Sequence, residues 1–201
     1  MRAMVLAETA SLDRNPAPLT LADLPRPVPG SGELLLEVSV CGVCHTEIDE
    51  IEGRATPPQL PVIPGHEIIG RIIASGPGCQ RYSKGERVGV GWIHSSSGAD
   101  DENLSDRFRA TGRDVDGGYA EFVTVPERYA YPVPAVFGDA EAAPLLCAGG
   151  VGFRSLRLTG LKDGQVLGLT GFGGSGHLVL QLAKHLYPAS KVFVFARSEQ
   201  E

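Results

Sequence analysis

The sequence has little of several features that define large classes of protein. Its four cysteines in 201 residues are too few for the disulfide scaffold of a small secreted protein. No window approaches the roughly 20 consecutive apolar residues of a membrane span, and MRAMVLAETA lacks the apolar run and cleavage site of a secretory signal. A net charge of −6 argues against nucleic-acid binding. We therefore expect a cytoplasmic protein without nucleic-acid or membrane partners, in which clustered cysteines indicate metal binding or catalysis.

The hydrophobic pattern of the sequence changes near residue 139, which divides the chain into two parts. Over residues 1–138, alternating or β-branched runs such as GELLLEVSV and HEIIGRIIASG are separated by glycine and proline, which predicts a β-rich domain. From residue 139 the pattern becomes helical, and then QVLGLT, a Gly-rich turn, a helical segment and KVFVF follow one another. That order is typical of a right-handed, parallel βαβ unit. We predict a mixed fold, with a second, α/β domain beginning over residues 139–201.

Cap and breaker residues give three local predictions. TEIDEIEGR is expected to form a short helix that ends at Gly53. The segment 139–160 is expected to be helical, with Asp139 as N-cap and Glu141 in the first turn. KVFVF is expected to be a buried strand.

The turn GFGGSG lies between a predicted strand and a predicted helix. Gly171, Gly173 and Gly176 fit the pattern G-x-G-x-x-G, with Gly174 inside it. Such glycines allow a tight turn and a close approach of backbone N–H groups to a pyrophosphate at the helix N-terminus. Dinucleotide binding is the prediction, and an ordinary Gly-rich loop is the alternative.

The end of the second predicted strand bears on which coenzyme is bound. An NAD site usually has an acid there that binds the ribose hydroxyl. Here Arg197 follows the strand and Glu199 comes only later. Arg197 can pair with a 2′-phosphate, which favours NADP(H), or it can simply be solvated.

The stretch VSVCGVCHTEID contains Cys41 and Cys44 in a Cys-x-x-Cys spacing. Such a pair can be half of a structural zinc site, a dithiol redox pair, or one metal ligand beside a cysteine without that role. A structural site would need a second Cys-x-x-Cys pair, and the sequence has none. The other candidate ligands are distant: His66 in PGHEIIG and Cys147 in APLLCAGG.

Five motifs in order resemble one enzyme family. GVCHTE, GHE, GGYAEF, LLCAG and GFGGSG follow one another as in the zinc-dependent medium-chain alcohol dehydrogenases, and the resemblance covers residues 1–201. That family joins a GroES-like catalytic barrel, here 1–138, to a Rossmann coenzyme domain, here 139–201. The resemblance implies one catalytic zinc held by Cys44, His66 and Cys147, with NAD(H) or NADP(H) as coenzyme. It also implies an alcohol or aldehyde substrate and, at full length, a homodimer or homotetramer.

The resemblance implies roles for the neighbouring residues too. Glu67 would lie close behind the metal, and Glu47 would accept from the second ring nitrogen of His66. His45 would approach the coenzyme pyrophosphate. Thr46 would hydrogen-bond the substrate hydroxyl and pass its proton outward. Zinc would act as a Lewis acid on the alcohol, and hydride would pass to the nicotinamide.

Three departures from the family pattern matter. Many members carry four cysteines for a structural zinc, whereas residues 91–112 have none, and Ser97 and Ser105 stand where cysteines are expected. We expect no structural zinc and another support for this loop, such as subunit contacts.

Asp49 stands where many members complete a proton relay with histidine, so a carboxylate or water would take that step. Finally, about two of the six Rossmann strands are present, which predicts an incomplete coenzyme site and an apolar strand edge prone to aggregation.

Other functions stay open. One is a non-catalytic zinc-binding fragment or assembly module that keeps the GroES-like domain. Another is a thiol oxidoreductase that uses Cys41 and Cys44, because thiolates at a helix start are activated. That chemistry does not need His66, Cys147 or the Gly-rich turn. A zinc-free quinone reductase of the same superfamily is disfavoured because it would lack the three-ligand set.

Overall fold

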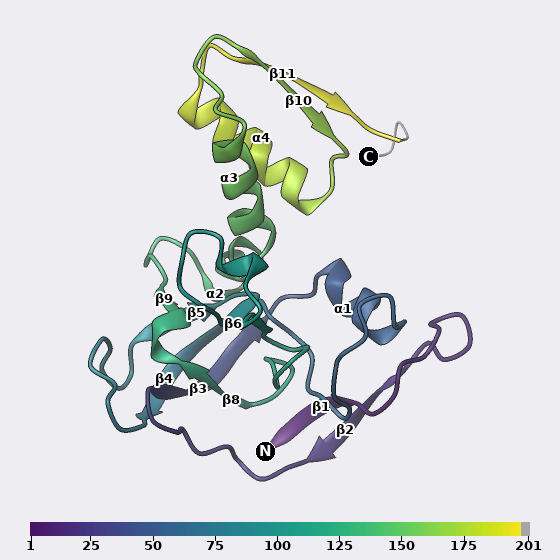
Figure 1. Ribbon diagram of the computed structural model, residues 1–201, viewed down its shortest axis with the longest axis vertical. Coiled ribbons are helices and arrows are strands. Elements are labelled where there is room, and N and C mark those ends of the chain that lie inside the picture. The colour runs from purple at the N-terminus through teal and green to yellow at the C-terminus, as the bar shows by residue number, and fades with distance from the viewer. Residues whose placement is uncertain (198–201) are drawn as a thin grey trace. The chain divides into compact units, whose positions relative to one another are not determined.

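The computed structural model describes residues 1–197 and separates the chain into two compact units, Met1–Leu146 and Cys147–Glu201 (Figure 1). Each unit has a hydrophobic core of its own. The predicted domain boundary between residues 138 and 139 stays a prediction. Among the described residues, no helix has the length and apolar character that crossing a membrane requires.

The first unit is built around a five-stranded antiparallel sheet of order β8-β3-β4-β5-β9. The strands are β3 (Glu33–Cys41), β4 (Ile68–Ser75), β5 (Arg87–Val90), β8 (Phe122–Pro126) and β9 (Ala130–Pro132). Alternation along these strands turns the apolar side chains to one core, whose fully buried members include Leu34, Leu36, Ile68 and Ile72. The β-rich first part is thus confirmed.

Two smaller antiparallel pairs complete the strands of this unit. They are β1 (Arg2–Leu6) with β2 (Leu19–Asp23), and β6 (Ile93–Ser95) with β7 (Arg109–Ala110). The strands β2, β6, β7 and β9 were not predicted, because they are short or only partly apolar. The helical elements that precede residue 138 are α1 (His45–Ile51), η1 (Glu102–Leu104) and η2 (Glu127–Tyr129). Helix α1 ends two residues before Gly53, which has a φ of 79°.

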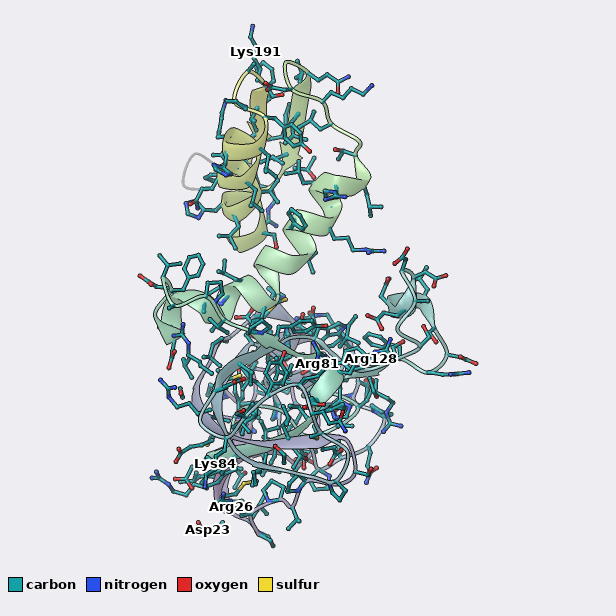
Figure 2. All side chains as sticks on the ribbon, turned by 90° about the vertical axis from the view of Figure 1, so that its left-hand side faces the viewer. Asp23, Arg26, Arg81, Lys84, Arg128 and Lys191 are labelled. Atoms are coloured by element: carbon teal, nitrogen blue, oxygen red, sulfur yellow. The ribbon has the colours of Figure 1, made fainter. Side chains whose placement is uncertain are left out.

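Hydrogen bonds at η2 fix a neighbouring loop. The Glu127 carboxylate accepts from the backbone N–H groups of Gln80 and Arg81 at 3.0 and 2.6 Å. The Arg81 guanidinium donates to the backbone carbonyls of Glu127 and Arg128 (Figure 2). The loop before β5 therefore has a defined position on the unit.

The helical segment expected from residue 139 is broken into three elements. These are α2 (Asp139–Ala142), η3 (Ala143–Leu146) and α3 (Ala148–Leu158). The N-cap is Gly138 rather than Asp139, which instead accepts from Arg87 at 2.7 Å. Pro144 supplies no backbone N–H and its ring disfavours a continuous α-helix, which accounts for the break.

The second unit has the predicted βαβ order. Strand β10 (Val166–Thr170) pairs in parallel with β11 (Lys191–Phe195), and α4 (Gly174–Leu186) connects them. Helices α3 and α4 pack with β10 around the buried Leu156, Val179 and Ala183. The expectation of a buried β11 was wrong, because Phe195 is 64% exposed. The described residues form only a two-stranded sheet here, so one face and both edges are uncovered.

Candidate metal centre

Helix α1 begins at the second cysteine of the Cys-x-x-Cys stretch. Cys44 is its N-cap, with an extended backbone, and its N–H donates to Glu47 Oε2 at 2.7 Å. The Cys44 Sγ and Thr46 Oγ1 atoms lie 3.6 Å apart. The first turn of α1 thus brings a thiol, a hydroxyl and a buried carboxylate together.

His66 approaches this turn from the start of β4. It follows Gly65, whose φ of 100° is the left-handed conformation that glycine adopts readily. His66 is 1% exposed, and its Nδ1 lies 2.6 Å from Glu47 Oε1. The two atoms form a close ion pair whose angle departs from that of an ideal hydrogen bond. The Nε2 atom of His66 is buried and has no hydrogen-bond partner. The Trp92 ring packs edge-on against the imidazole, with 5.0 Å between the ring centroids. Nothing in the sequence indicated this contact.

The charge state of His66 follows from these contacts. Burial opposes its protonation, but Cys44 and Glu47 outweigh burial and raise the pKa of the imidazole to about 10. These contacts favour a proton on the imidazole, and a metal ion bound at Nε2 would compete with it.

Four donor side chains converge at this point. One ligand atom from each of Cys44, His66, Glu67 and Cys147 lies within 4.8 Å of the others. Cys147 is the first residue of the second unit, and it is bonded to Leu146, which packs in the first. Two thiols and an imidazole are the ligand types that zinc prefers. A buried, unpartnered Nε2 facing such donors fits a metal ion, and the residues between 1 and 197 contain no second donor group of this kind.

Gly42, between the two cysteines, is explained by Glu67. The Gly42 N–H donates to the Glu67 carbonyl at 2.9 Å. A Cβ on Gly42 would stand 2.0 Å from Glu67 Oε2, so any larger residue would displace that carboxylate. In the sequence, the glycine between the two cysteines was the only hint that another group packs closely against this turn.

Cys41 has a different environment from Cys44. It ends β3 and is partly buried, and a Cβ added to Gly65 or Gly118 would lie 2.8 Å from its Sγ, so both glycines lie against the thiol. Burial, partly offset by a backbone hydrogen bond, raises the pKa of this thiol to about 12. A thiol that stays protonated is a poor nucleophile, which counts against the dithiol redox pair.

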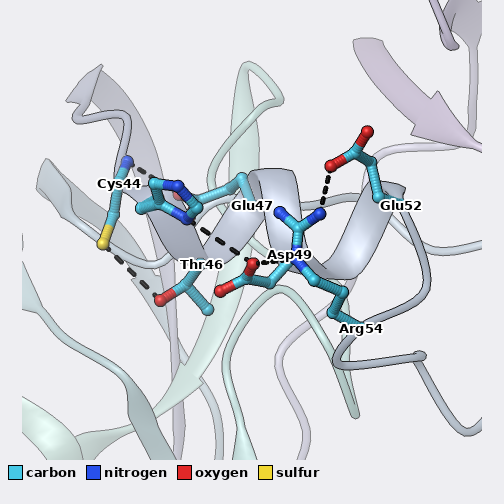
Figure 3. A network of polar contacts seen from close by, with 7 residues as sticks. Cys44, Thr46, Glu47, Asp49, Glu52 and Arg54 are labelled. Atoms are coloured by element: carbon cyan, nitrogen blue, oxygen red, sulfur yellow. Dashed lines mark hydrogen bonds and ion pairs between the residues drawn. The ribbon is translucent and has the colours of Figure 1, made fainter. Parts of the chain in front are cut away.

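Asp49 lies on the exposed side of α1 (Figure 3). Its Oδ1 is 3.5 Å from His45 Nδ1 and 2.6 Å from Arg54 Nε, and Arg54 also pairs with Glu52. The hydrogen bond from Arg54 is the main cause that lowers the pKa of Asp49. Asp49 is therefore an ionised carboxylate, held in place by Arg54 beside the exposed His45.

The glycine-rich turn has the geometry that its motif requires. Gly171 has a φ of 85°, and a Cβ on Gly176 would stand 2.8 Å from the Gly171 carbonyl oxygen. Space is open around Gly173, the N-cap of α4, and Gly174 is the first residue of that helix. The turn thus keeps backbone N–H groups accessible at a helix N-terminus.

Arg197 is the last described residue and is exposed just after β11. Glu199, the later acid, lies outside the described residues. The choice between a ribose-binding acid and a phosphate-binding arginine stays a prediction.

Comparison with known proteins assigns the family. Residues 30–135 match the alcohol dehydrogenase GroES-like domain. The probable alcohol dehydrogenase AdhA of Mycobacterium tuberculosis is 40% identical over 98% of this chain, and an alcohol dehydrogenase of Geobacillus stearothermophilus is 37% identical over 88%. The chain spans 59% and 55% of those two relatives.

Solved structures agree. A cobalt- and zinc-bound thermostable alcohol dehydrogenase from Pyrobaculum aerophilum superposes with a TM-score of 0.87 at 26% identity, over 100% of this chain and 60% of that one. The structure of CAD from Helicobacter pylori, complexed with NADP(H), gives 0.85 at 26% identity, over 98% and 59%. The chain therefore belongs to the zinc-type medium-chain alcohol dehydrogenase family.

Proposed function

We propose that the protein oxidises alcohols to aldehydes or ketones, with zinc as its metal and NAD(P)⁺ as hydride acceptor. The observation that carries the proposal is the convergence of Cys44, His66 and Cys147, with an unpartnered His66 Nε2 among the donor atoms. These three side chains would hold one zinc ion, with Glu67 beside them. A structural zinc is not part of the proposal.

Zinc in such a site supplies Lewis acidity toward an alcohol oxygen. The chain's own residues would orient the metal ligand and carry the proton away. Glu47 fixes the tautomer and orientation of His66 by holding Nδ1. Thr46, whose hydroxyl lies 3.6 Å from the Cys44 sulfur, would accept a hydrogen bond from the substrate hydroxyl and pass the proton outward by releasing its own hydroxyl proton as it takes that of the substrate. Asp49 and His45 are the exposed groups through which that proton would reach solvent.

The coenzyme would bind at the turn GFGGSG, with its pyrophosphate at the N-terminus of α4 and near His45. Arg197 supports a preference for NADP(H), because a guanidinium can pair with the 2′-phosphate. The predicted substrate is a primary aliphatic or aromatic alcohol. A cytoplasmic location and a homo-oligomer of two or four subunits belong to the same proposal.

A second candidate is a zinc-binding module without catalysis. It is favoured by one observation: the described residues of the second unit form a sheet of only two strands, β10 and β11. Such a unit would retain the metal centre but hold a coenzyme poorly.

Metal content and turnover of the purified chain distinguish these candidates. About one zinc per chain together with alcohol-dependent reduction of NAD⁺ or NADP⁺ supports the dehydrogenase. One zinc without reduction of either coenzyme supports the module. A chain without zinc contradicts both, and Cys44→Ser is the matched variant in which the metal should be lost.

A further inference from the structure

Trp92 is the single tryptophan of the chain, and its ring lies against a proposed metal ligand. The indole and the imidazole of His66 have their centroids 5.0 Å apart and their planes inclined by 74°. Aromatic pairs favour this edge-on arrangement over a face-to-face one, so the contact has a preferred geometry. Trp92 therefore bears on how the imidazole of His66 is oriented.

The orientation of His66 is not settled by its polar contact alone. Glu47 holds a single atom of the ring, Nδ1, at 2.6 Å. A ring held at one atom can still turn about that contact, and Nε2 would then move relative to the other donor atoms of the site. A second contact on the ring fixes its plane, which is what a preorganised metal ligand requires.

The position of Trp92 is itself fixed by its neighbours. Thr111, which is fully buried, donates from its hydroxyl to the Gly91 carbonyl and from its backbone N–H to the Trp92 carbonyl, both at 2.9 Å. The Phe108 ring packs on the indole with 6.2 Å between the centroids. The indole thus has a defined place from which it can orient the imidazole.

We propose that Trp92 is a positioning residue of the metal centre, which fixes the plane of the His66 ring so that Nε2 is directed at the two thiol donors. The inference rests on the proposed zinc site. It gives Trp92 no place among the ligands, because the indole N–H can only donate. It depends on the packing of rings and on no change of charge.

The test compares Trp92→Leu, which keeps an apolar side chain without a ring, with Trp92→Phe, which keeps an aromatic ring. Zinc affinity of the full chain is measured by competition with a chromogenic chelator, and Co²⁺ bound in place of zinc reports on ligand geometry through its visible absorption. Trp92→Leu should bind zinc about twofold to tenfold more weakly, the range for an aromatic pair, and its Co²⁺ spectrum should change. Trp92→Phe should recover most of the affinity and the wild-type spectrum.

Two results would overturn the inference while leaving the zinc site intact. One is a Trp92→Leu protein with the zinc affinity and the Co²⁺ spectrum of the wild-type chain. The other is a loss of affinity of the same size in Trp92→Leu and Trp92→Phe, because the bulk of the indole and not a ring edge would then be what counts. A wild-type chain that binds no zinc would defeat the proposed function, and this inference with it.

Phe122→Leu is the matched control, since Phe122 belongs to the same unit and its ring packs against Arg26 at 4.3 Å. It should leave the zinc affinity and the Co²⁺ spectrum unchanged. If Trp92→Leu does not fold, as judged by its melting curve, Phe108→Ala replaces it. That variant removes the ring that packs on Trp92, so zinc should bind about twofold more weakly or worse. Wild-type zinc affinity in Phe108→Ala would contradict the proposal.

Discussion

Cys41 and Cys44 share a motif, but they differ in what surrounds the sulfur. Cys41→Ser should leave zinc content unchanged, because burial raises the pKa of this thiol to about 12. It should lower the free energy of unfolding by about 1 kcal/mol, since a hydroxyl replaces an apolar group. Zinc per chain and urea unfolding measure both effects. Loss of zinc in Cys41→Ser, with retention in Cys44→Ser, would reverse the assignment.

Glu127 predicts how stability depends on pH. Burial would raise its pKa, but the backbone N–H groups that it accepts from outweigh burial and lower it. A group whose pKa is lower in the folded state contributes stability above its unfolded pKa of roughly 4.3, and that stability is lost as the pH falls. Glu127→Gln should therefore cost about 1–2 kcal/mol at pH 7 and much less at pH 3.

Unfolding at both pH values checks the prediction for Glu127. Glu141→Gln is the comparison, because Glu141 caps the short helix α2 from an exposed position. An effect of Glu127→Gln that is as large at pH 3 as at pH 7 would show that shape matters there, not charge.

The proposed metal ligands show what sequence reasoning can reach at the scale of residues. His66 and Cys147 were predicted from the order of family motifs, because no spacing rule joins ligands on distant segments. Trp92 was not predicted. Its contact with His66 exists only after the residues that follow β5 meet the start of β4, and a tryptophan next to a strand is not distinctive in the sequence.

At the scale of elements, the loop between β6 and β7 has no cysteines that could bind a structural zinc, so other interactions must hold its conformation. Glu102 Oε2 accepts from the Gly98 N–H at 3.0 Å and from the Tyr129 hydroxyl at 2.8 Å. The Tyr129 oxygen accepts from the Ser96 N–H at 3.0 Å. The loop was expected to need support other than a structural zinc, and these hydrogen bonds within the first unit supply such support.

Glu102→Ala should therefore loosen this loop without unfolding the unit. We expect backbone hydrogen exchange over residues 96–104 to quicken by about 10- to 100-fold, because the two lost bonds are worth about 1–3 kcal/mol in total. Asp106→Ala, an exposed acid in the same loop, is the control. Equal protection in Glu102→Ala and the wild-type chain would mean that other contacts hold the loop.

Periodic elements were predictable, and irregular ones were not. The runs in β3, β4 and β10 and the helical spacing in α4 identified those elements from sequence. The break at η3 was missed because the surrounding apolar spacing suits a helix, and only Pro144 opposes it. Strand β11 was identified as a strand, but its burial depends on neighbours that the described residues do not provide.

At the scale of the whole molecule, the apolar surface of β11 should make the chain self-associate. Phe193 and Phe195 are 54% and 64% exposed on a strand that pairs with β10 alone among the described residues, while Lys191 lies exposed at its start (Figure 2). Such edges template pairing with other chains. Phe195→Lys should shift sedimentation toward the monomer, whereas Leu158→Lys, on α3, should change it little. Equal association of all three proteins would contradict the prediction.

The division into two units passes next to a proposed metal ligand, since Leu146 ends the first and Cys147 begins the second. A chain of residues 1–146 keeps its own core and should fold, but it lacks one of the thiols. We expect its zinc affinity to fall at least 100-fold below that of residues 1–160, because losing a ligand costs no less than losing a ligand's partner. Residues 1–160 with Cys147→Ser should behave like 1–146. If 1–146 binds zinc as tightly as 1–160, Cys147 is not a ligand, and Glu67 becomes the third protein donor.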